Sequence, residues 1–494
     1  MLGLVKAAFR CERSCLQSSN YGMVMLCIGI CSLALPTPSK ASEQPNILLI
    51  MADDCTFRDL PLYGGQNART PNLDAFARES LVFERAYLCS AMCQPCRAEL
   101  YSGQYPMRNG CAWNHSASRS ETRSLPHYFG DLGYRVGIAG KVHVLPQSAF
   151  PFESVDGYDD NCVRNPTKPH DINQVSAFMA RDSKQPFCLV VALVEPHVPW
   201  VMGDPSAYPP ETLKLPPNIA DTELSRDAFS RYLAEITYMD NQVGEILAAL
   251  ELSGQAKNTI VMFTSEQGAQ FPGCKWTNWD TGVHTALIAR WPDHTLPGTR
   301  THALVQYADV VPTLLEVAGQ SADNKSLDGK SFLAVLEGQS QKHRQFVYGM
   351  HNNIPEGPAY PVRSVTDGEY HLIHNLTPHE IFIEKHLMGL QGDGLLNNPY
   401  WGTWVFSTEQ KTKSYQLVKR YMLRPPVELY RLSDDPYEMN NLAGRTEVSE
   451  IQTRLTKELE LWMQSQGDPG IEQDTPESHR AAKQGKHRFF PPAG

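Results

Sequence analysis

The sequence between residues 46 and 54 is Asn46-Ile47-Leu48-Leu49-Ile50-Met51-Ala52-Asp53-Asp54, an apolar run that ends in two aspartates. A short, nearly continuous apolar run is typical of a strand that is covered on both faces. Similar runs recur at 134–139, 187–194 and 259–264, and a helical spacing of apolar residues covers 225–253. Alternation of buried strands with amphipathic helices predicts an α/β fold in which a mainly parallel sheet lies between layers of helices.

The chain has 494 residues, which is enough for two or three domains or for one large α/β domain with an appendage. The strand-and-helix pattern predicts a main domain at 45–335. After residue 340 short strands and a closing helix replace it, which predicts a smaller C-terminal α+β subdomain at 340–466. Residues 467–494 combine Gly, Pro and charge and are expected to form a flexible tail.

The first 41 residues have the pattern of a signal peptide. Basic residues precede an apolar run at 22–35, and Ser39-Lys40-Ala41 is a small-x-small cleavage site. The run is too short to span a bilayer comfortably, so we expect no stable membrane insertion after cleavage, although a retained anchor is the alternative. The pattern predicts an exported protein, either periplasmic or secreted.

The charge of the chain restricts its partners. The formal net charge is −10, and removal of 1–41 takes away a net +3, which leaves −13. A strongly acidic surface argues against nucleic-acid binding through a basic face. An anionic ligand would therefore have to be attracted by a local positive pocket. Nothing in the sequence predicts the oligomeric state.

Polar side chains follow each of four predicted strands at the point where the strand ends. The pairs are Asp53 with Asp54, Lys141 with His143, Glu195 with His197, and Glu266 with Gln267. Each pair alone has a simpler explanation as a helix cap, a solvated turn or a structural histidine. Ligands of open α/β sheets, however, collect beyond the carboxyl ends of the strands, so we expect these pairs to converge.

A cysteine motif, Cys93-Gln94-Pro95-Cys96-Arg97, lies between the first two pairs. Two cysteines at this spacing can form a redox dithiol or half of a zinc site. A second zinc half would need another close pair of Cys or His, but the later cysteines stand singly. A thioredoxin-like motif would suit a compact domain of roughly one hundred residues, which this long chain is not.

The cysteine motif resembles the Cys-x-Pro-x-Arg signature of sulfatases of the alkaline phosphatase superfamily. The family order of motifs is matched by Asp53-Asp54, the Cys93 motif, Gly140-Lys141-Val142-His143, His197, Glu266-Gln267-Gly268 and Lys275. The resemblance covers about 45–465 and implies an alkaline phosphatase-like fold and the hydrolysis of sulfate from a sulfated sugar. Stretches at 140–146 and 360–365 are most similar to the heparan N-sulfatase (sulfamidase) branch. That branch implies glycosaminoglycan degradation, with removal of an N-sulfate from a terminal glucosamine.

The resemblance also implies roles for single residues. Cys93 would be oxidised to formylglycine by a formylglycine-generating enzyme, and the hydrated aldehyde would supply the nucleophilic oxygen. The implied ligands of one divalent metal are Asp53, Asp54, residue 93, Glu266 and Gln267. Their hard oxygens favour calcium, or magnesium, over zinc. The implied catalytic set is Cys93, Arg97, Lys141, His143, His197 and Lys275, with His197 as the acid and His143 as the base.

Three residues depart from the family pattern. Glu266-Gln267 stands where most sulfatases carry Asp-Asn, Cys96 where serine is commonest, and Lys275 where the sulfamidase branch would suggest arginine. The longer Glu266-Gln267 pair keeps the charge and the ligand types, so we expect the metal site to persist. A dead or altered site is the alternative.

The walls of a substrate pocket are less defined by the sequence. His115 and Arg363 are candidates for substrate binding, and so are Trp113 and Trp200, whose simpler explanation is core packing. We expect Arg363 to close the pocket from the C-terminal subdomain. Open alternatives are an O-sulfatase for another polysaccharide, a phosphodiesterase or phosphonate hydrolase of the same superfamily, and a non-catalytic carbohydrate-binding relative.

Overall fold

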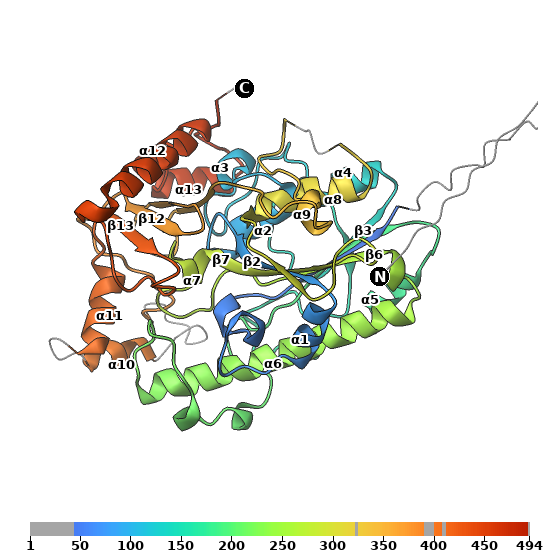
Figure 1. The fold of residues 1–494 in the computed structure, drawn as a ribbon, viewed down its shortest axis with the longest axis horizontal. Coiled ribbons are helices and arrows are strands. Elements are labelled where there is room, and N and C mark those ends of the chain that lie inside the picture. Colours follow the sequence, from blue (N-terminus) through green and yellow to red (C-terminus); the bar gives the residue numbers. More distant parts are fainter. Residues whose placement is uncertain (1–43, 322–324, 390–399, 408–411, 493–494) are drawn as a thin grey trace, which may run out of the picture. The chain divides into compact units, whose positions relative to one another are not determined.

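The computed structural model describes residues 44–321, 325–389, 400–407 and 412–492 (Figure 1). The predicted signal peptide at 1–41 lies outside the described residues. Residues from Gln44 onward belong to one compact unit. Within the described part of the chain, no helix combines the length and the apolar character needed to cross a membrane.

The centre of this unit is a large sheet, which holds nine strands among the described residues, in the order β4-β3-β5-β1-β6-β7-β2-β8, with β9 beside β2. The strands are β1 (Asn46–Met51), β2 (Leu81–Tyr87), β3 (Arg135–Gly140), β4 (Glu153–Val155), β5 (Phe187–Ala192), β6 (Thr259–Thr264), β7 (His284–Arg290), β8 (Thr299–Thr301) and β9 (Val305–Gln306). All pairings are parallel except those of β7 with β6 and with β2. The predicted mainly parallel sheet is thereby confirmed.

Helices cover both faces of the large sheet (Figure 1). The helices are α1 (Pro71–Arg78), α2 (Cys93–Ser102), α3 (Pro106–Asn109), α4 (Leu125–Asp131), α5 (Asn173–Ala180), α6 (Glu223–Leu252), α7 (Asp280–Val283), α8 (Val310–Val317), α9 (Leu333–Leu336), α10 (Tyr400–Phe406), α11 (Lys413–Met422), α12 (Ser449–Ser465) and α13 (Pro476–Lys483). Successive side chains of β1 point to opposite faces. Leu48 and Ile50 pack in the core layer of α1, α5 and α6, whereas Ile47 and Leu49 pack in that of α2, α4 and α8.

A second, smaller sheet lies in the C-terminal part of the chain. It is antiparallel in the order β10-β11-β12-β13. Its strands are β10 (Val347–His351), β11 (Val362–Thr366), β12 (Tyr370–Asn375) and β13 (Val427–Arg431). Helix α12 packs on this sheet, where its Leu455, Leu459 and Trp462 share a core with Leu372 and Leu429. This arrangement agrees with the predicted C-terminal α+β region.

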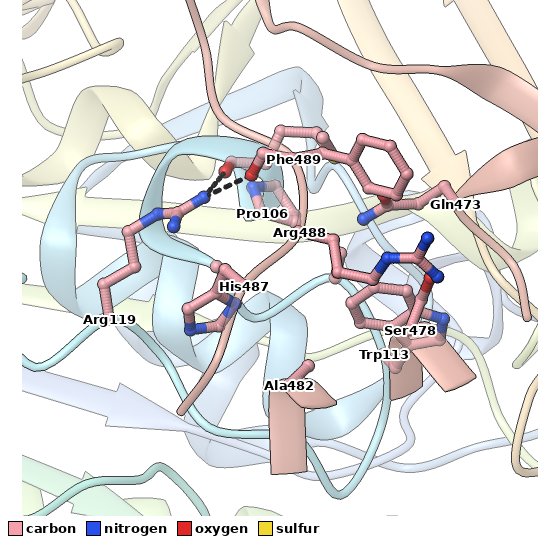
Figure 2. A pocket seen from close by; sticks show the side chains of 12 residues that line it. Pro106, Trp113, Arg119, Gln473, Ser478, Ala482, His487, Arg488 and Phe489 are labelled. Atoms are coloured by element: carbon pink, nitrogen blue, oxygen red, sulfur yellow. Dashed lines mark hydrogen bonds between the residues drawn. The ribbon is translucent and has the colours of Figure 1, made fainter. Parts of the chain in front are cut away.

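The C-terminal segment differs from the predicted flexible tail. Residues 467–492 contain α13 and pack on the rest of the chain. Asp474 is buried and accepts hydrogen bonds from the backbone N–H groups of Asn353 and Tyr360, at 2.8 and 2.7 Å. Arg119 donates to the carbonyl oxygen of Phe489 at 2.7 Å, beside a small cavity (Figure 2). Composition alone suggested mobility, but these specific polar contacts fix the segment.

Candidate active site

The carboxyl ends of four neighbouring parallel strands, β3, β5, β1 and β6, meet at one edge of the large sheet. Lys141 follows β3, His197 follows β5, Asp53 and Asp54 follow β1, and Glu266 follows β6. Lys141 Nζ lies 2.5 Å from Asp53 Oδ2, and His197 Nε2 lies 3.3 Å from Asp54 Oδ2. The structure therefore brings most of the expected side chains together, whereas Glu195, buried after β5, neither lines the pocket nor belongs to the carboxylate cluster.

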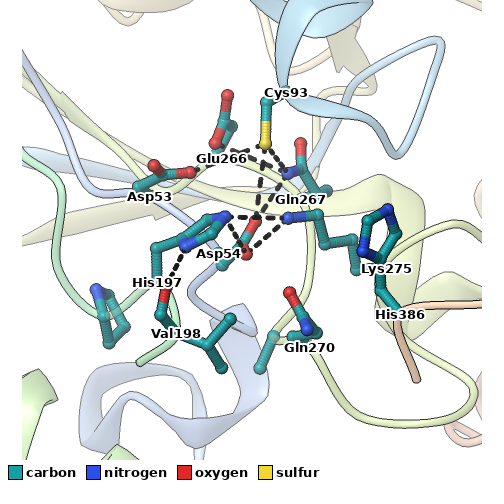
Figure 3. Close-up of polar contacts among 12 residues, drawn as sticks. Asp53, Asp54, Cys93, His197, Val198, Glu266, Gln267, Gln270, Lys275 and His386 are labelled. Atoms are coloured by element: carbon teal, nitrogen blue, oxygen red, sulfur yellow. Dashed lines mark hydrogen bonds and ion pairs between the residues drawn. The ribbon is translucent and has the colours of Figure 1, made fainter. Parts of the chain in front are cut away.

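Cys93 is the first residue of α2 and lies against this cluster (Figure 3). Its Sγ lies 3.8 Å from one carboxylate oxygen of both Asp53 and Asp54, and 3.1 Å from Gln267 Nε2. The first N–H groups of a helix have no partner inside the helix, so this position also favours an anion. Burial, together with the nearby Glu266, raises the pKa of the Cys93 thiol. The unmodified residue is thus a protonated thiol and a poor nucleophile.

The site has the composition of a hard-metal centre. One ligand atom from each of Asp53, Asp54, Cys93 and Glu266 lies within 4.8 Å of the other three, and all four side chains are buried. Burying three carboxyl groups together is costly unless positive charge compensates them. Carboxylate oxygens are the ligands that Ca²⁺ and Mg²⁺ prefer. These residues therefore fit a divalent hard cation.

Gln267 and Cys96 have different places in this centre. Gln267 turns its amide nitrogen towards the carboxylates and donates to Asp54 Oδ1 at 2.7 Å. Rotation of the Gln267 amide group by a half-turn would point Oε1 towards the carboxylates, and Oε1 is the atom that would bind a metal. Cys96 Sγ lies 3.2 Å from Glu266 Oε1, but among the described residues no metal-capable group contains both Cys93 and Cys96. The geometry does not support a zinc site built on the two cysteines.

Three buried cations surround the carboxylates. Lys275 Nζ lies 2.7 Å from Asp54 Oδ2, Arg97 Nε lies 2.7 Å from Glu266 Oε1, and Lys141 pairs with Asp53. Burial opposes ionisation of Asp53, but Lys141 beside it lowers the pKa of this carboxyl well below its usual range. Charges act strongly in such a water-poor place. The site thus supplies the local positive charge that the acidic protein as a whole lacks.

The pKa values of the two histidines of the site are shifted in opposite directions. Burial opposes the charging of His197, but Cys162 and Asp54 raise its pKa well above the ordinary value. Burial and the neighbouring Lys141 lower the pKa of His143 well below the ordinary value. These surroundings favour the protonated form of His197 and the neutral form of His143. Environments that separate two pKa values in this way distinguish an acid from a base.

The hydrogen bonds of the two rings agree with this difference. His197 Nδ1 lies 2.5 Å from the carbonyl oxygen of Val198, to which it donates. Its Nε2 lies 3.3 Å from Asp54 Oδ2, which can accept its proton, and 3.2 Å from Lys275 Nζ, which can only donate to the unprotonated nitrogen. His143 Nδ1 is buried and has no hydrogen-bond partner among the described residues. One ring is held as a proton donor, and the other has a free buried nitrogen.

A small pocket with a volume of about 100 Å³ opens onto Cys93. It is lined by Cys93, Asn114, His115, Lys141, His143, Cys162, Val163, His197, Gln270, Lys275, Trp276, Glu356 and His386. His115 lines the pocket, as the sequence suggested. Asn114, Trp276, Glu356 and His386 carried no such signal, because they lie outside the strand ends and belong to no motif. Only their neighbours in the chain, such as Lys275 beside Trp276, could have drawn attention to them.

Three of the proposed substrate-binding residues lie elsewhere, which corrects the prediction. Arg363 is fully buried in β11, where Nη2 lies 3.0 Å from Asp468 Oδ1 and Nη1 donates to a backbone carbonyl. The reason is that the closing C-terminal segment brings Asp468 to it. Trp113 lines the separate cavity of Figure 2, and Trp200 stacks on Phe271 in the core at 4.9 Å between ring centroids.

Comparison with known families gives an independent view of the chain. The family model described as Sulfatase matches residues 45–320, which is more than half of the chain. This chain belongs to the sulfatase family. A second model, described as N-sulphoglucosamine sulphohydrolase, C-terminal, matches residues 275–395. Members of this family hydrolyse sulfate esters or N-sulfates and generally use a divalent metal and a formylglycine.

This sulfatase has curated relatives along most of its length. An ulvan-active sulfatase of Formosa agariphila is 30% identical over 461 residues, which cover 91% of this chain and 87% of the relative. N-sulphoglucosamine sulphohydrolase of Homo sapiens is 29% identical over 488 residues, which cover 89% and 94%. A solved structure, described as a complex with its substrate D-glucosamine-2-N,6-O-disulfate, has a TM-score of 0.63 at 19% identity and covers 87% of this chain and 100% of its own. The expected alkaline phosphatase-like fold of this sulfatase is thereby confirmed.

Proposed function

We propose that this sulfatase removes the N-sulfate from a terminal glucosamine and that residue 93 acts as formylglycine. The observation that carries the sulfate chemistry is that His197 and His143, whose pKa values are shifted in opposite directions, line one pocket with Cys93, Lys141 and Lys275. Sulfuryl transfer needs a proton donor for the leaving atom and a proton acceptor for the nucleophile. A site with only a proton donor, or only a proton acceptor, would serve only one of these two proton transfers.

The choice of sugar rests on the C-terminal part of the chain. The match at 275–395 is to a model described for N-sulphoglucosamine sulphohydrolase, and a human relative carries the same name. The pocket has a volume of about 100 Å³, which is small for a ligand site and supports recognition of one residue at a chain end over a long polymer groove. Its positive charge is confined to the buried end that holds Lys141 and Lys275.

The residues of the pocket divide the work as follows. Lys141 and Lys275 hold sulfate oxygens as point charges, and Arg97 steadies charge at residue 93. His197 gives its Nε2 proton to the oxygen or nitrogen that leaves sulfur. His143 accepts a proton at its free ring nitrogen so that sulfate can be released. The oxidised residue 93, when hydrated, supplies the attacking oxygen and a second hydroxyl.

Calcium is the proposed metal, held by Asp53, Asp54, residue 93, Glu266 and Gln267. Three carboxylates and an amide match the oxygen-rich coordination that Ca²⁺ accepts with flexible geometry, while Mg²⁺ is the alternative. A bound cation would supply Lewis acidity and a template for the sulfate. Its binding would also favour the ionised form of Glu266, whose pKa burial raises to about 8.

Maturation of Cys93 must precede folding. The residues Cys93, Gln94, Pro95, Cys96 and Arg97 are all buried, each 2% exposed or less. An external formylglycine-generating enzyme could not reach this motif in the folded chain. We therefore propose that this partner acts on the extended chain during export, in agreement with the signal peptide expected at 1–41. A mature N-terminus at Ser42 in the exported protein would test the export, and an uncleaved cytoplasmic chain would contradict it.

The central test joins intact mass with substrate release. The purified protein should show loss of the Cys93 thiol mass in favour of an aldehyde, and Cys93→Ala should release no sulfate while keeping its thermal unfolding transition. Among sulfated monosaccharides, kcat/KM should be highest for N-sulfoglucosamine, ahead of glucosamine 6-O-sulfate. Hydrolysis of internal O-sulfates with no action on N-sulfoglucosamine would refute the substrate but leave the sulfatase chemistry. Cleavage of phosphonate or phosphate diesters in preference to all sulfates would refute the sulfate assignment.

A further inference from the structure

One buried carboxylate of the pocket has no part in the sulfate chemistry. Glu356 is 1% exposed, yet it lines the pocket. Asn114 Nδ2 donates to its Oε1 at 2.7 Å, and His386 Nε2 lies 2.6 Å from its Oε2. His115 Nε2 lies 3.8 Å from Oε1. The carboxylate thus holds Asn114 and His386 directly, and Asn114 Nδ2 in turn lies 3.3 Å from His115 Nε2.

The charge of Glu356 is unexpected in a pocket for an anion. Burial opposes its ionisation, but the hydrogen bond and charge of His386 lower the pKa of this carboxyl to about 2. A fixed negative charge would repel the sulfate group, so it belongs to a different part of the ligand. Carboxylates and imidazoles bind hydroxyl groups well, because they offer acceptor lone pairs and N–H donors.

The backbone at this part of the pocket is strained. His115 and Trp276 have φ values of 56° and 63°, which are uncommon for residues other than glycine. Asp54 and His143, in the catalytic cluster, share this conformation, with φ of 55° and 42°. Strain of this kind persists where the surrounding structure enforces it, and it concentrates at functional sites. The His115 region thus shares this conformation with two of the proposed site residues, as do Asp293 and Glu438, which do not line the pocket.

An aromatic surface completes the arrangement. The rings of Trp276 and His386 are stacked, with centroids 5.6 Å apart and planes 11° from parallel. Both residues line the pocket, and Figure 3 places His386 beside Lys275. Trp276 follows Lys275 directly in the chain, so the stacked rings lie next to a lysine that is proposed to bind sulfate. Such a combination of flat apolar surface and fixed polar groups orients a small ligand.

We propose that His115 binds a hydroxyl group of the sugar that carries the scissile sulfate, with the stacked Trp276 and His386 as the adjoining wall. Glu356 is the positioning residue, which holds His386 directly and His115 through Asn114. This inference rests on the proposed function, because it requires a sugar sulfate as the substrate. His115, whose side chain is half exposed, contacts the sugar, while the nearly buried Glu356 acts through its partners. The subsite therefore determines affinity for the sugar and leaves the sulfate chemistry to the residues around Cys93.

The test compares a sugar sulfate with a sulfate that has no sugar. Glu356→Gln removes the charge and keeps the shape, and His115→Ala removes a half-exposed imidazole. The matched control is Glu380→Gln, an exposed glutamate that does not line the pocket. Kinetics are measured with N-sulfoglucosamine and with 4-nitrophenyl sulfate, and thermal unfolding verifies that each variant is folded.

We expect KM for N-sulfoglucosamine to rise about tenfold or more in Glu356→Gln and in His115→Ala, because lost uniform binding raises KM with little change in kcat. For 4-nitrophenyl sulfate, kcat/KM should stay within about twofold, and the control should match the wild type on both substrates. Equal losses on both substrates would show a merely structural role and overturn the proposal. An unchanged KM for the sugar would also overturn it.

The outcome is separable from that of the proposed function. If the wild type prefers another sulfated monosaccharide, the N-sulfate assignment is wrong, and the same comparison is made with the preferred sugar. If the wild type cleaves 4-nitrophenyl sulfate but no sulfated monosaccharide, both proposals are overturned. A KM effect confined to the sugar substrate supports the subsite whichever sulfate position is cleaved.

Discussion

Lys275 Nζ lies 2.7 Å from Asp54 Oδ2, and both side chains are buried. The same nitrogen lies 3.2 Å from His197 Nε2, so this lysine connects a proposed metal ligand with the proposed acid. Lysine stands here where the sulfamidase branch would suggest arginine, and it contributes one compact charge without a bidentate fork. It offsets the charge of Asp54 and, as a cation, restrains the pKa of His197.

Replacement of Lys275 by Met should therefore change both rate and pH dependence. We expect kcat/KM to fall by about 10²-fold to 10³-fold, the range for loss of one group that stabilises developing charge. Because Lys275 lowers the pKa of His197, its removal should move the alkaline limb of the rate profile to higher pH. Lys275→Arg is the control and should keep most of the activity. A lower kcat/KM with an unchanged alkaline limb would show that Lys275 does not influence the pKa of His197.

The pH profile of the wild type should report the two histidines. Activity requires neutral His143, whose pKa is lowered, so kcat/KM should fall on the acid side only well below pH about 6.5. It also requires protonated His197, whose pKa is raised, so the alkaline fall should begin well above that value. The measurement is kcat/KM from pH 4 to 10. An acid limb above the ordinary histidine pKa would be inconsistent with the proposed roles.

Metal removal should abolish activity reversibly. Chelation should reduce sulfate release to background, and Ca²⁺, or Mg²⁺ less well, should restore it, because the donors are hard oxygens. Elemental analysis should find one divalent ion per chain, and Asp54→Ala should lose it. Stoichiometric zinc that survives Asp54→Ala and is lost in Cys96→Ala would favour the cysteine site instead.

Arg363 should matter for stability and not for substrate binding. Arg363→Met leaves Asp468 buried without its partner, and we expect the free energy of unfolding to fall by about 3–5 kcal/mol. KM of the folded fraction should remain within about twofold. Urea unfolding and steady-state kinetics together test this. A large rise in KM at unchanged stability would restore the substrate-binding role that the sequence suggested.

His351 should make the fold sensitive to acid. Burial lowers the pKa of this histidine to about 4, whereas an unfolded histidine titrates near 6.5. The unfolded state therefore binds the proton first, and stability present above pH about 6.5 is lost as the pH falls towards 4. This single group should cost about 2 kcal/mol between pH 7 and 5. Urea unfolding at both pH values should show a smaller decrease for His351→Gln, and an equal decrease would contradict the prediction.

The local sequence pattern was sufficient to predict the central sheet of this sulfatase and the residues at its edge. Buried strands such as Asn46–Met51 are recognisable from continuous apolar character, and the side chains that follow parallel strands necessarily meet at one edge of the sheet. Asp53, Lys141, His197 and Glu266 could therefore be placed together before any coordinates were known. The Cys93 motif is contiguous, so it could also be recognised from the sequence alone.

Only the tertiary structure showed which residues line the pocket and that the C-terminal segment packs on the rest of the chain. Arg363 belongs to a strand, and its direction depends on which face the C-terminal segment covers and on Asp468, which lies 105 residues away. Glu356 reaches Asn114 across 242 residues, a pairing without local sequence pattern. Contacts between loops depend on chain packing and not on periodicity. The sequence thus determined which side chains meet at the proposed active site, whereas packing determined which side chains surround them.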